Sequence, residues 1–427
     1  MKLNLEKIAS KRIALVLSGG VVKAATWHLG VALALEELGF TFEKINDSLG
    51  DCEKKKESKL NIETCVGSSS GSLIGLFLSC GYKPSEIISS SFGGDLPMPI
   101  EEIVSLLSSS PATSKAQKRF KKLTYKDIMS FRRPIKKPPE SKIYKPFANF
   151  PFFLQKLLKP LINISGIFST VGISNHLKKY VLSENSTFND FNIDLFIVAS
   201  RLDYSGKVIF SKYNYPSPNN DPMASFYTGV HPADAVAASM SVPPIYSPYP
   251  IKNLYNGRTD YFIDGDIRDT LSHHVALDHQ CEVIISSWTH TPYHYHDEIG
   301  SLINYGLPAI CVQAIYLMLQ KKILNTKHEA QKANNVIENV HQYMKDQKFS
   351  SEHIKNIISI IENQLHHKRD NIFIDIHPSH DNYELFFSSF FSLDSEHSVA
   401  AIKMGYDKTM EVLRNHFKQD LVGPSLG

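Results

Sequence analysis

The chain is poor in cysteine. Five of its 427 residues are cysteine, an odd number, and their spacing matches no metal-binding motif. Cys65, Cys281 and Cys311 stand within apolar runs, where a free cysteine packs as a small hydrophobic side chain. The small, odd number of cysteines favours a reducing compartment, and their spacing gives no reason to expect a cysteine-bound metal.

Long apolar runs are also lacking. No run of about 18 apolar residues is present, so we expect no transmembrane helix. The first strand is predicted to begin at Ile13, which leaves no room for a cleavable signal peptide before it. We therefore expect a cytoplasmic protein, with export by a non-classical route as the alternative. Because 42% of the residues are hydrophobic, one α/β domain with a large core and insertions is predicted.

A segment of glycine and serine follows a predicted apolar strand. Residues 65–75 read Cys-Val-Gly-Ser-Ser-Ser-Gly-Ser-Leu-Ile-Gly, and Ser69 is the centre of a Gly-x-Ser-x-Gly motif. Gly67 and Gly71 would relieve crowding at a sharp strand-to-helix turn, so that the Oγ of Ser69 stands exposed as a nucleophile at the edge of a sheet. The alternative is a flexible loop of small residues, which glycine and serine commonly form.

A second glycine-containing turn lies upstream. The continuous apolar run Ile13–Leu17 is typical of a strand buried on both faces, and a helix is predicted from about residue 23 to 38. The turn between them, Ser-Gly-Gly at 18–20, would present backbone N–H groups to an anion. The dinucleotide and P-loop motifs are both incomplete here, which leaves the oxyanion of an acyl-transfer intermediate as the predicted anion.

An acidic residue ends a third apolar segment. Residues 261–266 read Tyr-Phe-Ile-Asp-Gly-Asp, so Asp264 is placed at the carboxyl end of a strand, where parallel α/β sheets bind their ligands. An Asp-Gly pair alone usually indicates no more than a turn. Asp264 therefore becomes a candidate catalytic residue only together with the other two motifs.

In this order, the glycine turn, the Gly-x-Ser-x-Gly motif and the Asp-Gly pair resemble the hallmarks of the patatin-like phospholipase family. Residues 194–206, 237–248 and 399–406 resemble further segments of that family. The resemblance implies a three-layer α/β/α fold with a central, mostly parallel sheet, in one patatin-like domain over residues 1–427. Its predicted parts are a core at about 10–110 and 166–290, a closing helix near 395–416, a basic lid-like insertion at 111–165 and a helical insertion at 297–370.

The resemblance also implies a catalytic dyad without histidine, in which Ser69 is the nucleophile and Asp264 is the base. His377, His380 and His397 are the candidates for a third member if a histidine were used. Neither a metal nor a cofactor is implied. The other site residues carried over from the family are the oxyanion donors Gly19, Gly20, Val21 and Ser70 and the supporting residues Lys23, Gly67, Gly71 and Gly265.

Two residues of the site depart from the family pattern. Val21 stands where the family loop has a third glycine, and a β-branched residue at positive φ is strongly disfavoured, so we expect the loop to follow a different backbone path. Asp266 replaces a glycine or alanine beside the base, and a like charge so close would raise the pKa of one carboxyl. A catalytically weak relative is therefore an alternative to an active enzyme.

The predicted insertion at 111–165 is strongly basic. Between Lys115 and Lys159 there are fourteen Lys and Arg residues and two acidic residues, a local net charge of +12, with aromatic residues interleaved. This pattern is typical of an interfacial anchor, so we predict peripheral contact of 115–159 with anionic membranes. A cap that packs on the core with its lysines in water is the alternative. No nucleic-acid-binding module accompanies the bases, so no nucleic acid partner is expected.

The predicted insertion at 297–370 carries apolar residues at helical spacing and is expected to be an added helical region. Its histidines, and those of residues 290–296, do not have the His-Glu-x-x-His spacing, and we predict no metal site.

The sequence thus predicts a lipid acyl hydrolase of the phospholipase A or lysophospholipase type, which cleaves carboxylic esters through an acyl-enzyme. One alternative is a membrane- or protein-binding module on a degenerate hydrolase scaffold. Another is an acyltransferase or thioesterase that uses the same dyad. The sequence leaves open whether a protein activator is needed.

Overall fold

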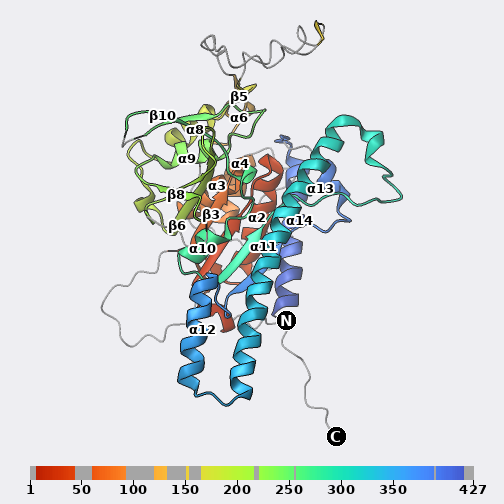
Figure 1. The fold of residues 1–427 in the computed structure, drawn as a ribbon. Coiled ribbons are helices and arrows are strands. Elements are labelled where there is room, and N and C mark those ends of the chain that lie inside the picture. Colours follow the sequence, from red (N-terminus) through yellow and green to blue (C-terminus); the bar gives the residue numbers. More distant parts are fainter. Residues whose placement is uncertain are drawn as a thin grey trace.

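One mixed β-sheet forms the centre of the protein (Figure 1). The computed structural model describes residues 6–43, 60–92, 120–131, 151–152, 165–215, 221–253, 256–388 and 391–417. The strands are β1 (Ile13–Leu17), β2 (Phe40–Thr41), β3 (Leu60–Ser68), β4 (Ser130–Phe131), β5 (Phe168–Ser169), β6 (Asp194–Arg201), β7 (Lys207–Phe210), β8 (Ala224–Tyr227), β9 (Tyr249–Lys252), β10 (Thr259–Asp264), β11 (Val283–Ser287) and β12 (Ile372–Ile376). In the described residues, ten of them form the main sheet in the order β12-β11-β1-β3-β6-β10-β9, with β2, β7 and β8 off this path, while β4 and β5 pair separately.

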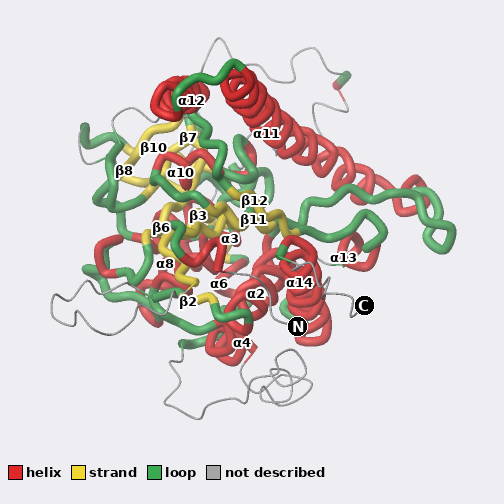
Figure 2. The backbone as a smooth tube through the Cα atoms, turned by 90° about the horizontal axis from the view of Figure 1, so that it is seen from below, coloured by secondary structure: helices red, strands yellow, loops and turns green. Residues whose placement is uncertain are grey.

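Helices cover both faces of the sheet. They are α1 (Glu6–Ala9), α2 (Val21–Glu37), α3 (Ser70–Ser79), α4 (Pro84–Phe92), α6 (Tyr125–Ile128), α8 (Val171–Tyr180), α9 (Pro232–Ser239), α10 (His273–Asp278), α11 (Gly306–Asp346), α12 (Ser351–Leu365), α13 (Tyr383–Phe387) and α14 (Ser395–His416). Figure 2 shows α2 and α14 on one side of the central strands and α10 on the other. The protein therefore has the three-layer α/β/α arrangement.

The strand β1 illustrates why the sequence produces these layers. Ile13, Leu15 and Leu17 pack in the core cluster that contains the buried sides of α2, α3, α9 and α14. Ala14 and Val16 point to the other cluster, beneath α10. Because side chains alternate along a strand, a strand covered on both faces must be apolar at every position. The continuous apolar run is thus explained by burial on both faces.

The strand that ends at Asp264 differs in direction from the sequence-based expectation. The strands β12, β11, β1, β3 and β6 are mutually parallel, whereas β10 is antiparallel to β6. Asp264 pairs with Ala199 of β6, next to Val198, which in turn pairs with Ser68 at the end of β3. The strand β10 therefore runs opposite to the parallel strands. It still ends at their carboxyl edge, where Asp264 lies close to the end of β3.

Much of the predicted basic segment 115–159 lies outside the described residues. The described parts are 120–131 and 151–152, and they include the highly exposed side chains of Phe131 and Phe152. In the other predicted insertion, α11 and α12 form a helical hairpin that extends beyond the sheet (Figure 1). Helix α14 packs along α2.

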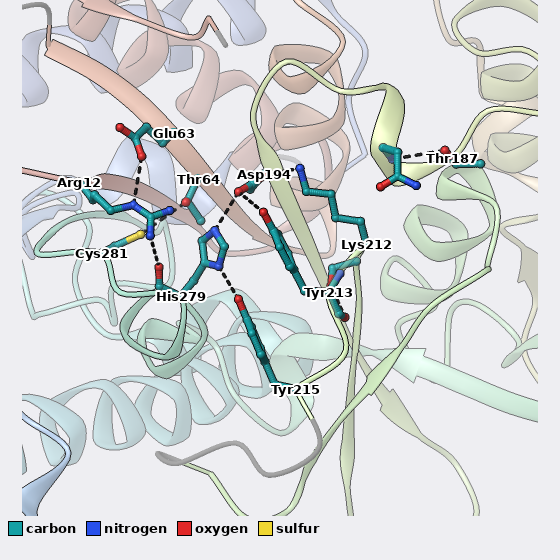
Figure 3. A network of polar contacts seen from close by, with 12 residues as sticks. Arg12, Glu63, Thr64, Thr187, Asp194, Lys212, Tyr213, Tyr215, His279 and Cys281 are labelled. Atoms are coloured by element: carbon teal, nitrogen blue, oxygen red, sulfur yellow. Dashed lines mark hydrogen bonds and ion pairs between the residues drawn. The ribbon is translucent and has the colours of Figure 1, made fainter. Parts of the chain in front are cut away.

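A polar network joins the amino-terminal ends of the parallel strands (Figure 3). Asp194, the first residue of β6, accepts hydrogen bonds from the Tyr213 hydroxyl at 2.8 Å and pairs with Lys212 at 2.5 Å and with the His279 Nε2 at 2.8 Å. Burial opposes ionisation of this carboxyl, but the hydrogen bonds from His279, Lys212 and Tyr213 hold the pKa of Asp194 well below its ordinary value. The network therefore stabilises the fold at the end opposite the glycine turn.

We expect Asp194→Ala to lower the free energy of unfolding by about 2–3 kcal/mol, because it leaves buried donors without their acceptor. A carboxyl whose pKa is depressed stabilises the fold above its unfolded value, about 3.9, and this contribution is lost as the pH falls. The difference between the variant and the wild type should therefore shrink below about pH 4. Urea unfolding at several pH values measures this, with the exposed Asp203→Ala as the control. Equal effects of both substitutions would contradict the assigned role.

Candidate active site

Ser69 lies on the sharp turn between β3 and α3. Its backbone has φ 50° and ψ −126°, a conformation that costs a non-glycine residue about 1–3 kcal/mol. Three hydrogen bonds hold the turn. The Ser69 N–H donates to the Ser239 Oγ at 2.8 Å, the Ser239 hydroxyl donates to the Val198 carbonyl at 2.6 Å, and the Ser72 hydroxyl donates to the Ser69 carbonyl at 2.6 Å. The strain is thus maintained by specific contacts, as in nucleophile elbows.

The two glycines of the motif are required by close backbone contacts. A Cβ on Gly71 would lie 2.4 Å from the Leu17 carbonyl oxygen, and a Cβ on Gly67 would lie 2.5 Å from the Ser72 Cα. Both distances are shorter than any ordinary contact, so larger residues would push α3 away from the end of β1. The motif therefore sets the position of Ser69 relative to the glycine turn at 18–20.

The glycine turn keeps its positive φ angles despite the valine. Gly20 has φ 129° and Val21 has φ 59°. We expected Val21 to change the backbone path because a valine disfavours positive φ, but Val21 itself lies in the left-handed region. The cost is about 1–3 kcal/mol. Helix α2 begins at Val21, so the free amides of its first turn lie at this end of the molecule.

Asp264 and Ser69 are brought together. The Ser69 hydroxyl lies beside the Asp264 carboxyl and favours its ionised form, and the Asp266 N–H donates a hydrogen bond to the Asp264 Oδ1 at 2.9 Å. Asp264 is fully enclosed, and this burial raises the pKa of Asp264 to about 6, although the Ser69 hydroxyl and the Asp266 amide both favour its ionised form. A carboxylate with such a pKa is suited to act as a general base near neutral pH. The serine and the carboxyl are therefore neighbours, as a serine–aspartate dyad requires.

The side chain of Asp266 contacts the glycine turn, which the sequence did not indicate. Its Oδ2 accepts a hydrogen bond from the Gly19 N–H at 2.7 Å. Burial raises the pKa of Asp266 well above the usual value, and the neighbouring charge of Asp264 raises it further. The sequence predicted that two neighbouring carboxyls would raise the pKa of one of them. The carboxyl whose pKa the neighbouring charge raises is that of Asp266. Its side chain also contacts one of the amides predicted to bind the oxyanion.

Ser69 is buried, with 4% of its surface exposed. We expected its Oγ to stand exposed at the edge of the sheet, and that expectation is wrong. The reason is the close approach of the glycine turn: a Cβ built on Gly19 would lie 2.4 Å from the Ser69 Cβ and 2.5 Å from the Asp266 Oδ2. Gly19 therefore lies directly against the serine, with Asp266 also close to Gly19.

Lys23 connects helices instead of facing the dyad. Its ammonium donates to the Tyr316 hydroxyl of α11 and to the Leu385 carbonyl of α13, both at 3.0 Å. Burial lowers the pKa of Lys23 to about 7. Lys23 therefore fixes the start of α2 against two elements of the C-terminal part of the chain.

The histidines that were candidates for a triad make other contacts. His377 stacks on Trp288, His380 bonds the Pro292 carbonyl, and His397 pairs with Asp394. A histidine that the sequence did not single out for catalysis, His290, lies beside Asp266. The Nε2 of His290 lies 4.0 Å from the Asp266 Oδ2, and burial, together with the charge of Lys23, lowers the pKa of His290 to about 3.

Two supporting residues were also missed by sequence reasoning. Ser239 holds the Ser69 amide, and the fully buried His28 bonds the Ser18 carbonyl at 2.9 Å. Ser239 belongs to the segment 237–248 that resembles the family, which was the available signal for it. His28 lies in an apolar helical stretch that gave no signal at all. In the part of the chain that the structure describes, no cluster of three His, Cys, Asp or Glu side chains could hold a metal ion.

An apolar cavity of about 450 Å³ adjoins the site. It reaches Val21 of the glycine turn and Ser70, the residue after the candidate nucleophile. Its size is within the range of about 300–1,000 Å³ that is usual for small-molecule pockets. Most of its lining is apolar and includes Leu29, Leu73, Ile74, Phe77, Ile173 and Met240. The cavity could hold a hydrocarbon chain with its polar end near Ser69.

Comparison with known proteins agrees with this geometry. The family model described as patatin-like phospholipase matches residues 15–277, which include the glycine turn, the serine motif and Asp264. None of the curated proteins compared with the chain matches it. Because the family match extends over more than half of the chain, the protein belongs to the patatin-like phospholipase family.

Proposed function

We propose that the protein is a lipid acyl hydrolase of the phospholipase A or lysophospholipase type, with Ser69 as nucleophile and Asp264 as base. Membership of the family supports acyl hydrolysis of lipids. The observation that carries the finer assignment is the position of Ser69, on a strained turn and with its hydroxyl beside the Asp264 carboxyl. The adjoining apolar cavity supports a long acyl chain as the part of the substrate that is bound.

In the proposed mechanism, the Ser69 Oγ attacks the ester carbonyl carbon while Asp264 accepts the hydroxyl proton. The tetrahedral intermediate then expels the alcohol, which receives that proton from Asp264. Water next attacks the acyl-enzyme and gives a proton to Asp264. The fatty acid is then released as Asp264 returns that proton to the Ser69 Oγ. The amides of Gly20, Val21 and Ser70 are the proposed oxyanion donors, with that of Gly19 once Asp266 releases it.

Two experiments test this proposal. A fluorophosphonate probe should label the purified protein, because an activated serine attacks phosphorus as it attacks an ester. Release of fatty acid from a lysophospholipid should exceed transfer to an added alcohol or thiol acceptor. Absence of both labelling and release would contradict the proposal, and dominant transfer would favour the acyltransferase alternative.

One observation favours a slow enzyme, namely the Asp266 carboxyl bound to the Gly19 amide. An oxyanion donor contributes about 10²–10³-fold to kcat, so an amide that already has an acceptor cannot contribute in full. We expect Asp266→Ala to raise kcat/KM on a soluble ester by about tenfold to a hundredfold.

Asp266→Asn is the matched control for this prediction. Its amide oxygen can still accept the Gly19 N–H, so we expect the rate to stay close to that of the wild type. Steady-state kinetics of both variants provides the measurement. A lower rate in Asp266→Ala, with normal thermal stability, would mean that Asp266 supports the site instead of blocking it.

A further inference from the structure

The segment 302–346, a 3₁₀ turn at Leu302–Tyr305 followed by helix α11, changes composition at residue 321, which divides it into an apolar first half and a charged second half. Residues 302–320 contain no Asp, Glu, Lys or Arg, whereas Lys321 and Lys322 follow at once and charged residues continue to Asp346. The segment Leu302–Asp346 is long and apolar enough to cross a membrane by length and composition. The expectation of no transmembrane helix stays a prediction, because length and composition alone do not show that this helix spans a membrane. The polar residues Asn304, Gln313 and Gln320 interrupt the apolar run, which is why no continuous run was visible.

Burial in the protein does not account for this composition. In the most apolar part of the segment, only 11% of the residues are buried. Ile303, Leu307 and Met318 expose 73%, 72% and 60% of their surface. A contiguous apolar patch on a soluble protein commonly marks an interaction site. The exposed apolar residues of this part are Ile303, Leu307, Ile310, Ile315, Leu317 and Met318.

The second half of the same helix provides an internal comparison. With 3.6 residues per turn, the outward face that carries Leu307, Ala314 and Met318 continues through Lys321, Asn325, His328, Glu329 and Lys332. Most side chains of both halves are exposed, yet only the second half has the charged surface expected of a helix in water. The first half is therefore suited to surroundings other than water.

The opposite face of this half attaches the helix to the protein. Tyr316 and Leu319 are buried, and the Tyr316 hydroxyl accepts the hydrogen bond from Lys23. The Gln313 side chain forms two hydrogen bonds of 2.9 Å with the backbone of Tyr293. A helix held along one side in this way cannot span a bilayer while these contacts persist, but its outward face can lie in the plane of one.

We propose that the outward face of residues 302–318 inserts into the interfacial region of a lipid bilayer. The choice of a lipid surface as the occupant rests on the proposed function. It is further supported by the lysine that follows the apolar face, since Lys321 would meet the headgroups as the apolar face enters the acyl region. Figure 2 shows this end of α11 extending past β12, toward α13 and away from the sheet.

The surface is connected to the candidate active site. Tyr316 packs edge-on against His290, whose Nε2 lies 4.0 Å from the Asp266 Oδ2. Through Lys23, the same tyrosine holds the first turn of α2, next to the glycine turn. The residue that attaches the proposed lipid-binding helix to the protein therefore also contacts the surroundings of the dyad.

The proposed contact differs physically from that predicted for 115–159. A basic segment binds anionic lipid through charge, and that attraction is screened in 1 M salt, where the Debye length is about 3 Å. An apolar helix face binds neutral lipid as well, and salt does not remove its contribution. Vesicles of phosphatidylcholine in high salt therefore remove the charge-driven contact of 115–159, and the loss of binding on substitution in α11 reports the contact of that helix.

The experiment uses full-length Ser69→Ala protein, so that hydrolysis does not alter the vesicles, and measures co-flotation with phosphatidylcholine vesicles in 1 M salt. We expect the double substitution Leu307→Gln and Leu317→Gln to lower the bound fraction at least tenfold. The matched control is Leu324→Gln with Val336→Gln, two exposed apolar residues in the charged half of the same helix, which should bind like the parent protein.

Three outcomes would overturn the proposal. They are no binding by the parent protein, equal binding by both double variants, and a dimer that only the Leu307/Leu317 variant loses while vesicle binding is unchanged, as seen by light scattering. The last would identify a second copy of the chain as the occupant. With Ser69 intact, the Leu307/Leu317 variant should hydrolyse a soluble short-chain ester at the wild-type rate, so failure of the lipid contact is distinguishable from failure of the proposed function.

Discussion

Ser69→Ala is expected to lower kcat/KM for ester hydrolysis by about 10⁴-fold or more, because the variant has no atom that can form the acyl-enzyme. It should also abolish fluorophosphonate labelling. The substitution removes one buried hydroxyl and leaves the turn held through the backbone of residue 69, so we expect the free energy of unfolding to change by less than about 1 kcal/mol. Kinetics on a soluble ester and thermal unfolding measure the two effects separately.

Ser79→Ala is a suitable control for this result. Ser79 is a fully buried serine at the other end of α3, so its loss removes a comparable hydroxyl from the same helix. Activity in this variant should stay near that of the wild type. If Ser69→Ala kept its activity after purification, the nucleophile assignment would be wrong, and the neighbouring Ser68, Ser70 and Ser72 would have to be tested.

Local patterns in the sequence were sufficient to predict the strands, turns and helices that position the site. The apolar run Ile13–Leu17 is a strand buried on both faces, and Gly39, with φ 92°, follows the end of α2 as a helix-terminating glycine. Gly67 and Gly71 flank a strand-to-helix turn at Ser69, as their spacing indicates. Each of these features depends on residues close together in the chain.

Features that depend on distant parts of the chain could not be predicted in this way. The direction of β10 follows from its pairing with β6, some sixty residues earlier, to which no local pattern points. The contact of Asp266 with the Gly19 amide joins residues 247 positions apart. The burial of Ser69 depends on the approach of Gly19, which is fifty positions earlier in the chain. Sequence reasoning therefore identified Asp266 as a departure but could not place its carboxyl.

Asp264→Asn is expected to lower kcat by about 10³- to 10⁴-fold, near the upper limit for loss of a general base. The amide keeps the size of the carboxyl and can still accept a hydrogen bond from Ser69, but it cannot take the proton. Fluorophosphonate labelling should become correspondingly slow, while Ser69 stays in place. Single-turnover kinetics with a chromogenic ester separates this chemical step from binding.

The pH dependence of the wild type provides an independent test of the same assignment. Burial raises the pKa of Asp264 to about 6, and only the carboxylate form can accept the proton of Ser69. The rate should therefore rise with pH through about 6 and level off above it. The residual activity of Asp264→Asn should lack this rise, because the titrating group has been removed.

A histidine acting as base would give a different pattern of variants. His290 is the sharpest control, because it lies beside Asp266 and burial lowers the pKa of His290 to about 3. We expect His290→Ala to retain activity within about tenfold, and His377→Ala, which removes a ring stacked on Trp288, to retain most of it. A loss in either histidine variant as large as that of Asp264→Asn, with a normal fold, would replace the dyad by a Ser-His-Asp arrangement.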